Sequence, residues 1–206
     1  MVATEWQELS LPGAELAIIE RWLVPDEADA LLAELLAAIP WENHRIRMFG
    51  REVASPRLSC WIGDPGASYV YSSTRFAPHP WPAPLSALRT RVEHACGTRF
   101  NSVLANLYRN GDDAMGWHSD DEPELGERPV IASLSLGAER RFRLRPRRPR
   151  GEPARRDDIR GLVLGHGSLL RMAGDTQRRY RHDLPRAKDV EQPRLNLTFR
   201  RIVTSR

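Results

Sequence analysis

The stretch VIASLSLGAERRFRLRPR (residues 130–147) decides the fold class of this chain. Apolar residues alternate with small or polar ones up to Gly137, and arginines alternate with Phe142 and Leu144 after it. Successive side chains of a β-strand point to opposite faces, so each alternation predicts a strand with one buried face. The stretch therefore predicts two strands joined at Gly137.

Similar patterns recur through the second half of the chain. The segment FNSVLANLYRNG (residues 100–111) alternates and ends at Asn110-Gly111, which is a turn signal. The segment LVLGHGSLLRM (residues 162–172) predicts another pair of strands, and RLNLTFRRI (residues 194–202) predicts a final strand. Short strands joined by tight turns are typical of an antiparallel sandwich or a jelly roll.

Two helices are predicted in the first half, where they would support the strands. The first lies in VPDEADALLAELLAAIPW (residues 24–41), with Pro25 at its start and Pro40 at its end. The second covers APLSALRTRVEHAC (residues 83–96) and stops at Gly97. The expected fold class is therefore mainly β with supporting helices (α+β).

The composition is that of an ordinary soluble globular protein, with 41% apolar and 28% charged residues in a chain of 206. This length fits one domain with a real core. The longest apolar run, residues 31–39, is interrupted by Glu34 and is too short to cross a membrane. No secretory signal is visible, and Cys60 and Cys96 are too few for a disulfide scaffold. We expect a cytoplasmic protein that does not enter a membrane.

The net charge is +4, the sequence pI is about 9.6, and Lys188 is the only lysine. Arginine grips phosphates and carboxylates through paired hydrogen bonds, so the composition allows a nucleic-acid partner. A chain rich in alanine, arginine, glycine and proline can also simply reflect a G+C-rich genome. The segment RPRRPRGEPARRDDIR (residues 145–160) is expected to be an exposed connection.

The segment GWHSDDEPE (residues 116–124) concentrates one histidine and four carboxylates. In a strand, residues two apart share a face, so His118 and Asp120 can reach one ion. Two histidines and one carboxylate with open positions beside them suit a non-haem Fe(II) that activates oxygen. A flexible acidic turn is the alternative. The second histidine must come from elsewhere, and the candidates are His44, His79, His94, His166 and His182.

The last predicted strand carries two different faces. Its core face holds Leu195, Leu197 and Phe199, and its polar face consists of Arg194, Asn196, Thr198 and Arg200. Two fixed guanidinium groups suit a ligand with two carboxylates. Upstream, Asn106 and Tyr108 share a face and could complete the same polar pocket. An arginine-rich edge strand is the alternative explanation of the arginines.

These residues together resemble the AlkB family of Fe(II)/2-oxoglutarate-dependent nucleic-acid dealkylases, in its DNA-repair branch. The resemblance covers roughly residues 45–203, and the matching pieces are MFGRE, SPR, YVYSS, NLYRNGDDAMGWHSDDE, IASLSLGAERRFRLR, GHGSLLRM, HDLPR and PRLNLTFRR. It implies a double-stranded β-helix (jelly roll) in a single dioxygenase domain over residues 1–206. Residues 1–97 would hold the helices and the nucleotide-recognition segments, and residues 98–206 would form the catalytic core.

The resemblance also implies the roles of the site residues. His118, Asp120 and His182 would bind Fe(II). Arg194 would hold the distal carboxylate of 2-oxoglutarate near Asn196 and Tyr108, while Arg200 and Asn106 would lie by the end that chelates the metal. Thr198 belongs to the same polar face. Trp117 departs from the small or acidic residue expected before the first ligand.

The implied reaction consumes O2 and 2-oxoglutarate and hydroxylates an N-methyl group, which leaves as formaldehyde. The substrate would be a base of the 1-methyladenine or 3-methylcytosine type in DNA. Asp121 and Glu122 at the mouth would accept hydrogen bonds from the exocyclic amine of this cationic base, unless they are only a solvated turn. Tyr71 would stack on the base, or it is an ordinary strand aromatic.

The expected partner is alkylated DNA, single- or double-stranded, and the protein is expected to be a monomer. The arginines between Arg140 and Arg160 are expected to contact phosphates. Phe49 in RMFGRE (residues 47–52) is expected to wedge between bases, with arginines such as Arg57 holding the hairpin against phosphates. The alternatives are a related enzyme acting on RNA or on a protein side chain, and a jelly roll that binds a ligand without turnover.

Overall fold

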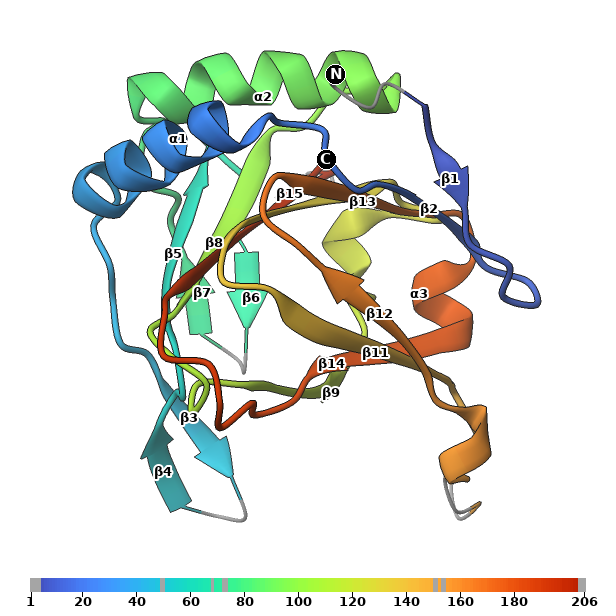
Figure 1. The fold of residues 1–206 in the computed structure, drawn as a ribbon. Coiled ribbons are helices and arrows are strands. Elements are labelled where there is room, and N and C mark those ends of the chain that lie inside the picture. Colours follow the sequence, from blue (N-terminus) through green and yellow to red (C-terminus); the bar gives the residue numbers. More distant parts are fainter. Residues whose placement is uncertain are drawn as a thin grey trace.

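The computed structural model describes residues 5–48, 51–67, 69–71, 74–149, 152 and 155–203. Within these residues two antiparallel sheets face each other, one of seven strands in the order β1-β2-β13-β10-β15-β8-β5 and one of four in the order β12-β11-β14-β9 (Figure 1). The larger sheet contains β1 (Gln7–Glu8), β2 (Glu15–Ile19), β5 (Leu58–Gly63), β8 (Ser102–Tyr108), β10 (Ile131–Gly137), β13 (Ser168–Ala173) and β15 (Arg194–Arg200). The smaller sheet contains β9 (Met115–His118), β11 (Arg140–Pro146), β12 (Arg160–Leu164) and β14 (Tyr180–Leu184). The predicted jelly roll is confirmed.

Three strands of the larger sheet, β1, β2 and β5, come from the part of the chain before residue 97, where the sequence patterns predicted no strand of this sheet. β5 pairs with β8, and β2 pairs with β13. The expected division at residue 97 therefore does not follow the sheet. A strand at a sheet edge is held by the partner it pairs with, and this partner lies far along the chain.

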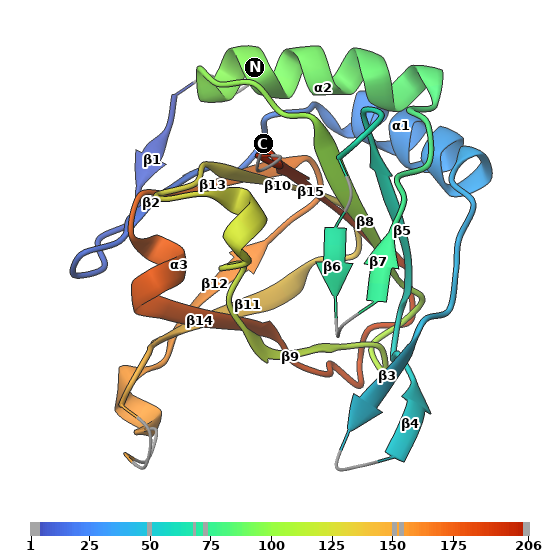
Figure 2. The ribbon, with the colours of Figure 1, turned by 180° about the vertical axis from the view of Figure 1, so that it is seen from behind.

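Both predicted helices are confirmed, as α1 (Pro25–Ala38) and α2 (Ala83–Cys96). A proline occupies the first turn of each, where the missing N–H leaves no bond unmade. Gly97 ends α2 in the left-handed region at φ 64°. The two helices lie side by side over the outer face of the larger sheet (Figures 1 and 2). No helix in the described part of the chain is long and apolar enough to cross a membrane.

The alternation of β15 separates an apolar core from a polar interior. Leu195, Leu197 and Phe199 are fully buried in the cluster that also contains Leu35 of α1 and Leu88 of α2. The opposite face of β15 points between the two sheets. This strand therefore fixes the helices on one side and builds the site on the other.

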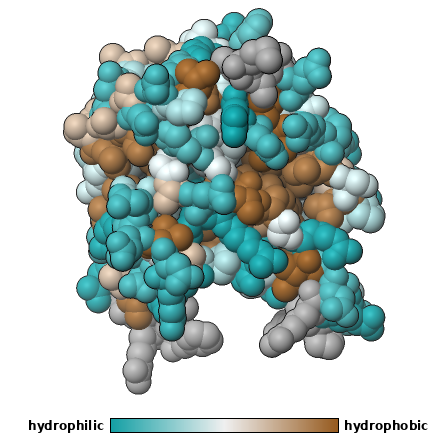
Figure 3. Space-filling model, in the orientation of Figure 1, coloured by the Kyte–Doolittle hydropathy of each residue, from teal (hydrophilic) through white to brown (hydrophobic). Residues whose placement is uncertain are grey.

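Short elements and hairpins complete the fold. α3 (Thr176–Arg179) connects β13 to β14, and the short 3-10 turns are η1 (Pro123–Leu125) and η2 (Arg156–Asp158). The hairpins are β3 (Arg45–Met48) with β4 (Arg51–Ala54) and β6 (Tyr69–Tyr71) with β7 (Thr74–Phe76). They lie outside both main sheets (Figure 2). Most of the face seen in Figure 1 is hydrophilic, with apolar residues gathered near its middle (Figure 3).

Candidate active site

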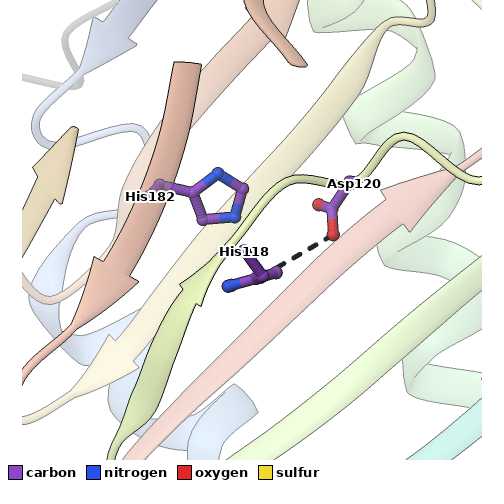
Figure 4. A group of neighbouring side chains, drawn as sticks. All are labelled: His118, Asp120 and His182. Atoms are coloured by element: carbon purple, nitrogen blue, oxygen red, sulfur yellow. Dashed lines mark ion pairs between the residues drawn. The ribbon is translucent and has the colours of Figure 1, made fainter. Parts of the chain in front are cut away.

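Two neighbouring strands bring the predicted histidines together. His118 ends β9 and pairs in register with His182 of β14. Their ring centroids lie 4.2 Å apart in an edge-to-face arrangement. Asp120 follows two residues after His118, and its Oδ1 lies 3.8 Å from His118 Nε2 (Figure 4). One ligand atom from each of the three residues can be chosen so that all lie within 4.8 Å of one another, which is close enough to share one ion.

The hydrogen bonds of the site leave its ligand atoms in the states that a metal needs. His118 Nδ1 lies 2.8 Å from the carbonyl oxygen of Gly116, and since a carbonyl only accepts, Nδ1 is the donor and Nε2 is the ring nitrogen that faces the ion. Burial, with a smaller contribution from His118, lowers the pKa of His182 to about 3. Its imidazole is therefore neutral near neutral pH, as metal coordination requires.

Asp120 is held as an anion in spite of its burial. Burial by itself would raise the pKa of this carboxyl group, but the positive charge of Arg200, followed by the two histidines, brings the pKa below its usual value. Arg200 Nη2 donates to Asp120 Oδ1 across 2.7 Å. The backbone N–H of Asp120 donates to Gln177 Oε1 at 3.0 Å. Gln177 lies on α3 and is itself buried.

The polar face of β15 lines the cavity that contains the three candidate ligands. Register pairing places Arg194 opposite Tyr108 and Asn196 opposite Asn106 on β8. The residues that line this cavity include Asn106, Tyr108, His118, Asp120, Ser133, His182, Arg194, Asn196, Thr198 and Arg200. The structure thus brings together all of the residues predicted for the metal and the co-substrate.

Arg194 is a buried cation at the far end of this cavity, with 2% of its surface exposed. Its Nη2 donates to Ser135 Oγ at 2.8 Å, and its guanidinium lies 5.4 Å from the centre of the Tyr108 ring. Burial lowers its pKa to about 10, so that it remains charged at neutral pH. Its buried Nε donates no hydrogen bond to any described residue. A buried donor without a protein partner is uncommon, and a guanidinium of this kind suits an anionic ligand.

The side chains of Asn196 and Thr198 form hydrogen bonds within the protein. Asn196 Nδ2 donates to Ser133 Oγ and to the carbonyl oxygen of Leu134, while Thr198 Oγ1 donates to Asn196 Oδ1. These bonds fix the shape of the cavity wall between Arg194 and Arg200.

Arg57 lies elsewhere than expected. Its side chain is buried, and Nε donates to Asn106 Oδ1 at 2.8 Å. A guanidinium buried against the co-substrate pocket cannot hold a surface hairpin against phosphates, so that expectation is corrected. Phe49 falls outside the described residues. Tyr71 is described only as a strand position of β6.

The expected phosphate contact is also wrong for Arg140, the first arginine of the run. Arg140 is 2% exposed and donates to the carbonyl oxygens of Asn110, Asp113 and Pro185, so it holds the loop between β8 and β9 to the loop after β14. Arg143 forms a paired hydrogen bond with Asp183, next to His182.

Three further residues, Arg147, Arg148 and Trp117, contact other side chains of the protein. Arg147 pairs with Asp121 and Arg148 pairs with Asp158, so both arginines already have carboxylate partners. Trp117 packs beneath the guanidinium of Arg145, whose central carbon lies 4.2 Å from the ring centre.

Asp121 and Glu122 lie at an opening next to the metal ligands. Both line a cavity of about 420 Å³ to which Asp120 also contributes. The expected position of these carboxylates at the mouth agrees with this geometry.

Gln177, Ser133 and Ser135 complete the site but were not predicted. Gln177 lies 57 residues from Asp120 in the chain, and no local pattern marks it. The two serines alternate with leucines in β10, so the strand pattern placed them on one face without indicating what they would contact.

A sequence profile of the 2OG-Fe(II) oxygenase superfamily matches residues 15–200. The chain belongs to this superfamily. Membership implies Fe(II), 2-oxoglutarate and O2. The site fits them, because two imidazoles and a carboxylate suit Fe(II) and the buried Arg194 suits a carboxylate. His118, Asp120 and His182 would hold the ion of this oxygenase, and Arg194 would hold the co-substrate.

The resemblance to the AlkB family is confirmed by similar proteins. The chain is 41% identical over 180 residues to human alpha-ketoglutarate-dependent dioxygenase alkB homolog 3. The aligned region covers 85% of this chain and 62% of that protein. It is 40% identical over 184 residues to human DNA oxidative demethylase ALKBH2, covering 87% and 70%. The chain thus spans about 62% of the first relative's length.

The solved structure of OsALKBH1 shares the fold. It superposes with a TM-score of 0.68 at 18% identity and covers 96% of this oxygenase and all of that chain.

Proposed function

We propose that this oxygenase demethylates N-alkylated bases of the 1-methyladenine and 3-methylcytosine type in DNA, and so repairs alkylation damage. The observation that carries the proposal is the common wall between the metal site and an acidic opening. Asp120 belongs to both, and Asp121 and Glu122 line the opening. A relative of 40% identity is named a DNA oxidative demethylase.

When bound, Fe(II) and 2-oxoglutarate supply the oxidising chemistry, in which O2 converts 2-oxoglutarate to succinate and CO2 while one oxygen atom enters the methyl group. The hydroxymethyl group then leaves the base nitrogen as formaldehyde. The protein orients the reactants. Its two histidines and Asp120 would hold the metal ion, Arg194 would hold the dicarboxylate, and the burial of Asp120 and His182 keeps bulk water from the site.

The acidic mouth fits the charge of the substrate. A base methylated on its Watson–Crick nitrogen is cationic and carries an exocyclic amine, to which Asp121 and Glu122 can offer acceptors. The base must leave the stack to reach the metal position. We assign the stacking partner to Tyr71 of β6.

Mass spectrometry of methylated oligonucleotides tests this function. After incubation with enzyme, Fe(II) and 2-oxoglutarate, each methylated base should lose about 14 mass units, the difference between a methyl group and a hydrogen atom. Release of CO2 from labelled 2-oxoglutarate should rise with methylated DNA and not with unmethylated DNA. If methylated RNA alone stimulates CO2 release, or if no substrate stimulates it, the assignment to DNA is rejected.

The proposed wedge is tested by Phe49→Ala on the same lesion in single- and double-stranded DNA. Loss of activity on the duplex with little change on single strands is expected, because unstacking costs a few kcal/mol only in the duplex. An equal loss of activity on both substrates, with a lower melting temperature of the protein, would instead identify Phe49 as a core residue.

A monomeric state, a cytoplasmic location and activity on RNA stay predictions.

A further inference from the structure

A second concavity adjoins the opening at the metal site. The opening itself has a volume of about 420 Å³. The neighbouring concavity has a volume of about 550 Å³ and is lined by β12, α3 and the end of β11. Arg147 and Arg178 line both. The two concavities therefore adjoin each other at these arginines, and together we call them the groove that leads away from the metal site.

The charge changes sign along this groove. Its near end carries the four carboxylates of Asp120, Asp121, Glu122 and Glu127 beside the three guanidiniums of Arg128, Arg147 and Arg178, so that its formal charge is −1. Its far end carries four arginines, which we call the arginine groove: Arg147, Arg160, Arg178 and Arg179. The far end also holds Asp157 and Asp158, but Asp158 is paired with Arg148 outside the lining. An excess of positive charge therefore remains there.

The fold makes little use of three of these arginines. Arg178 and Arg179 lie on a helix of four residues, with side chains 70% and 59% exposed, and their nearest carboxylate oxygens, both of Asp175, are 3.9 and 3.8 Å away. Arg160 is exposed and donates to the backbone oxygen of Asp157. Exposed ion pairs of this kind contribute little to stability. Their guanidinium groups remain available for an external anion.

We propose that the sugar-phosphate backbone of the strand next to the target nucleotide runs along the arginine groove. This inference rests on the proposed function. An alkylated nucleotide carries a positive charge on its base and negative charges on its phosphates, and the groove has the complementary order, acidic at the metal site and basic beyond it. Arginine also matches phosphate through paired hydrogen bonds, whereas an acidic peptide would not need the carboxylates at the near end.

The test compares three proteins in salt-dependent binding to a fluorescent, unmethylated single-stranded oligonucleotide, so that binding is measured without turnover. They are the wild type, the double variant Arg160→Gln/Arg178→Gln, and the control Arg21→Gln/Arg201→Gln. Arg21 and Arg201 are exposed and line neither cavity. Thermal unfolding should be the same in all three, because the replaced side chains are on the surface.

Each phosphate contact on a single strand contributes about 0.7 to the slope of log affinity against log salt, so the groove variant should lose about 1.4. Between about 50 and about 200 mM salt the wild type should then lose about sevenfold more affinity than the groove variant. The control should follow the wild type. Replacement by lysine, Arg160→Lys/Arg178→Lys, should keep the wild-type slope because the charge is kept.

Unchanged affinity and slope in the groove variant would overturn the inference. So would poly-glutamate displacing the oligonucleotide from the wild type as well as an unlabelled strand does. If methylated DNA is not demethylated but the salt dependence of binding is weaker in the groove variant than in the wild type, the proposed function fails and the groove stands. If demethylation proceeds with KM for a long strand equal in wild type and variant, the function stands and the groove fails.

Discussion

Arg200 donates a hydrogen bond to Asp120 across 2.7 Å, and both side chains are buried to within a few per cent. Arg200 ends β15 of the larger sheet, and Asp120 follows β9 of the smaller sheet. The arginine keeps the carboxylate ionised while occupying one of its oxygens. The metal ligand and the co-substrate strand are therefore one electrostatic unit.

Replacing Asp120 by Ala should remove both metal binding and turnover, because the site loses a ligand and its negative charge. It should also lower the stability of the metal-free protein by about 3–5 kcal/mol, since the guanidinium of Arg200 would stay buried without its anion. Titration with Fe(II) or Co(II) and thermal unfolding measure the two effects. The exposed Asp112→Ala is the control. Undiminished metal affinity in the Asp120 variant would disprove the proposed triad.

Arg194→Lys should raise the 2-oxoglutarate concentration needed for half-maximal rate by about 10- to 100-fold, which corresponds to the loss of one charged hydrogen bond. An ammonium group cannot reproduce the planar pair of donors. Arg201→Lys, an exposed position just beyond the same strand, is the matched control. A co-substrate titration identical to that of the wild type would show that Arg194 does not hold the dicarboxylate.

Gln177 should act as a positioning residue for Asp120, since its side-chain oxygen accepts the backbone N–H of the ligand. Gln177→Met keeps the volume but loses this acceptor, so it should weaken metal affinity by about 10- to 100-fold and change the Co(II) absorption spectrum. Gln177→Glu keeps an acceptor oxygen and should restore most of the affinity. Equal affinities and spectra in both variants would assign Gln177 to packing alone.

The metal-free protein should lose stability in acid through His182. Its pKa is about 3 in the folded state, against an ordinary value of 6.5. Between these values the unfolded chain binds the additional proton, so the free energy of unfolding falls as the pH falls from about 6.5 towards about 3, by up to about 1.4 kcal/mol per pH unit. Denaturant unfolding across this range measures the slope. His182→Gln should have a shallower slope, and an equal slope would contradict the assignment.

The sequence by itself determined those features that depend on neighbouring residues. The alternation of Arg194, Asn196, Thr198 and Arg200 with apolar residues predicted which face of β15 would be polar, because side chains of a strand alternate whatever they pack against. The proline and glycine positions predicted the ends of α1 and α2 in the same local way.

The tertiary structure decided which distant residues meet. β2 and β5 joined the larger sheet, Arg57 was buried against Asn106 49 residues away, and Gln177 reached Asp120. These contacts depend on pairing between segments far apart in the chain, and no local period reports the partner of a strand or of a buried polar group. Arg140 is an example of what local sequence cannot predict. Its charge indicated a phosphate contact, but the loops that fold around it supply three carbonyl acceptors and bury its side chain. Whether an arginine becomes a surface contact or an internal anchor is decided by burial, and burial is a property of the assembled fold.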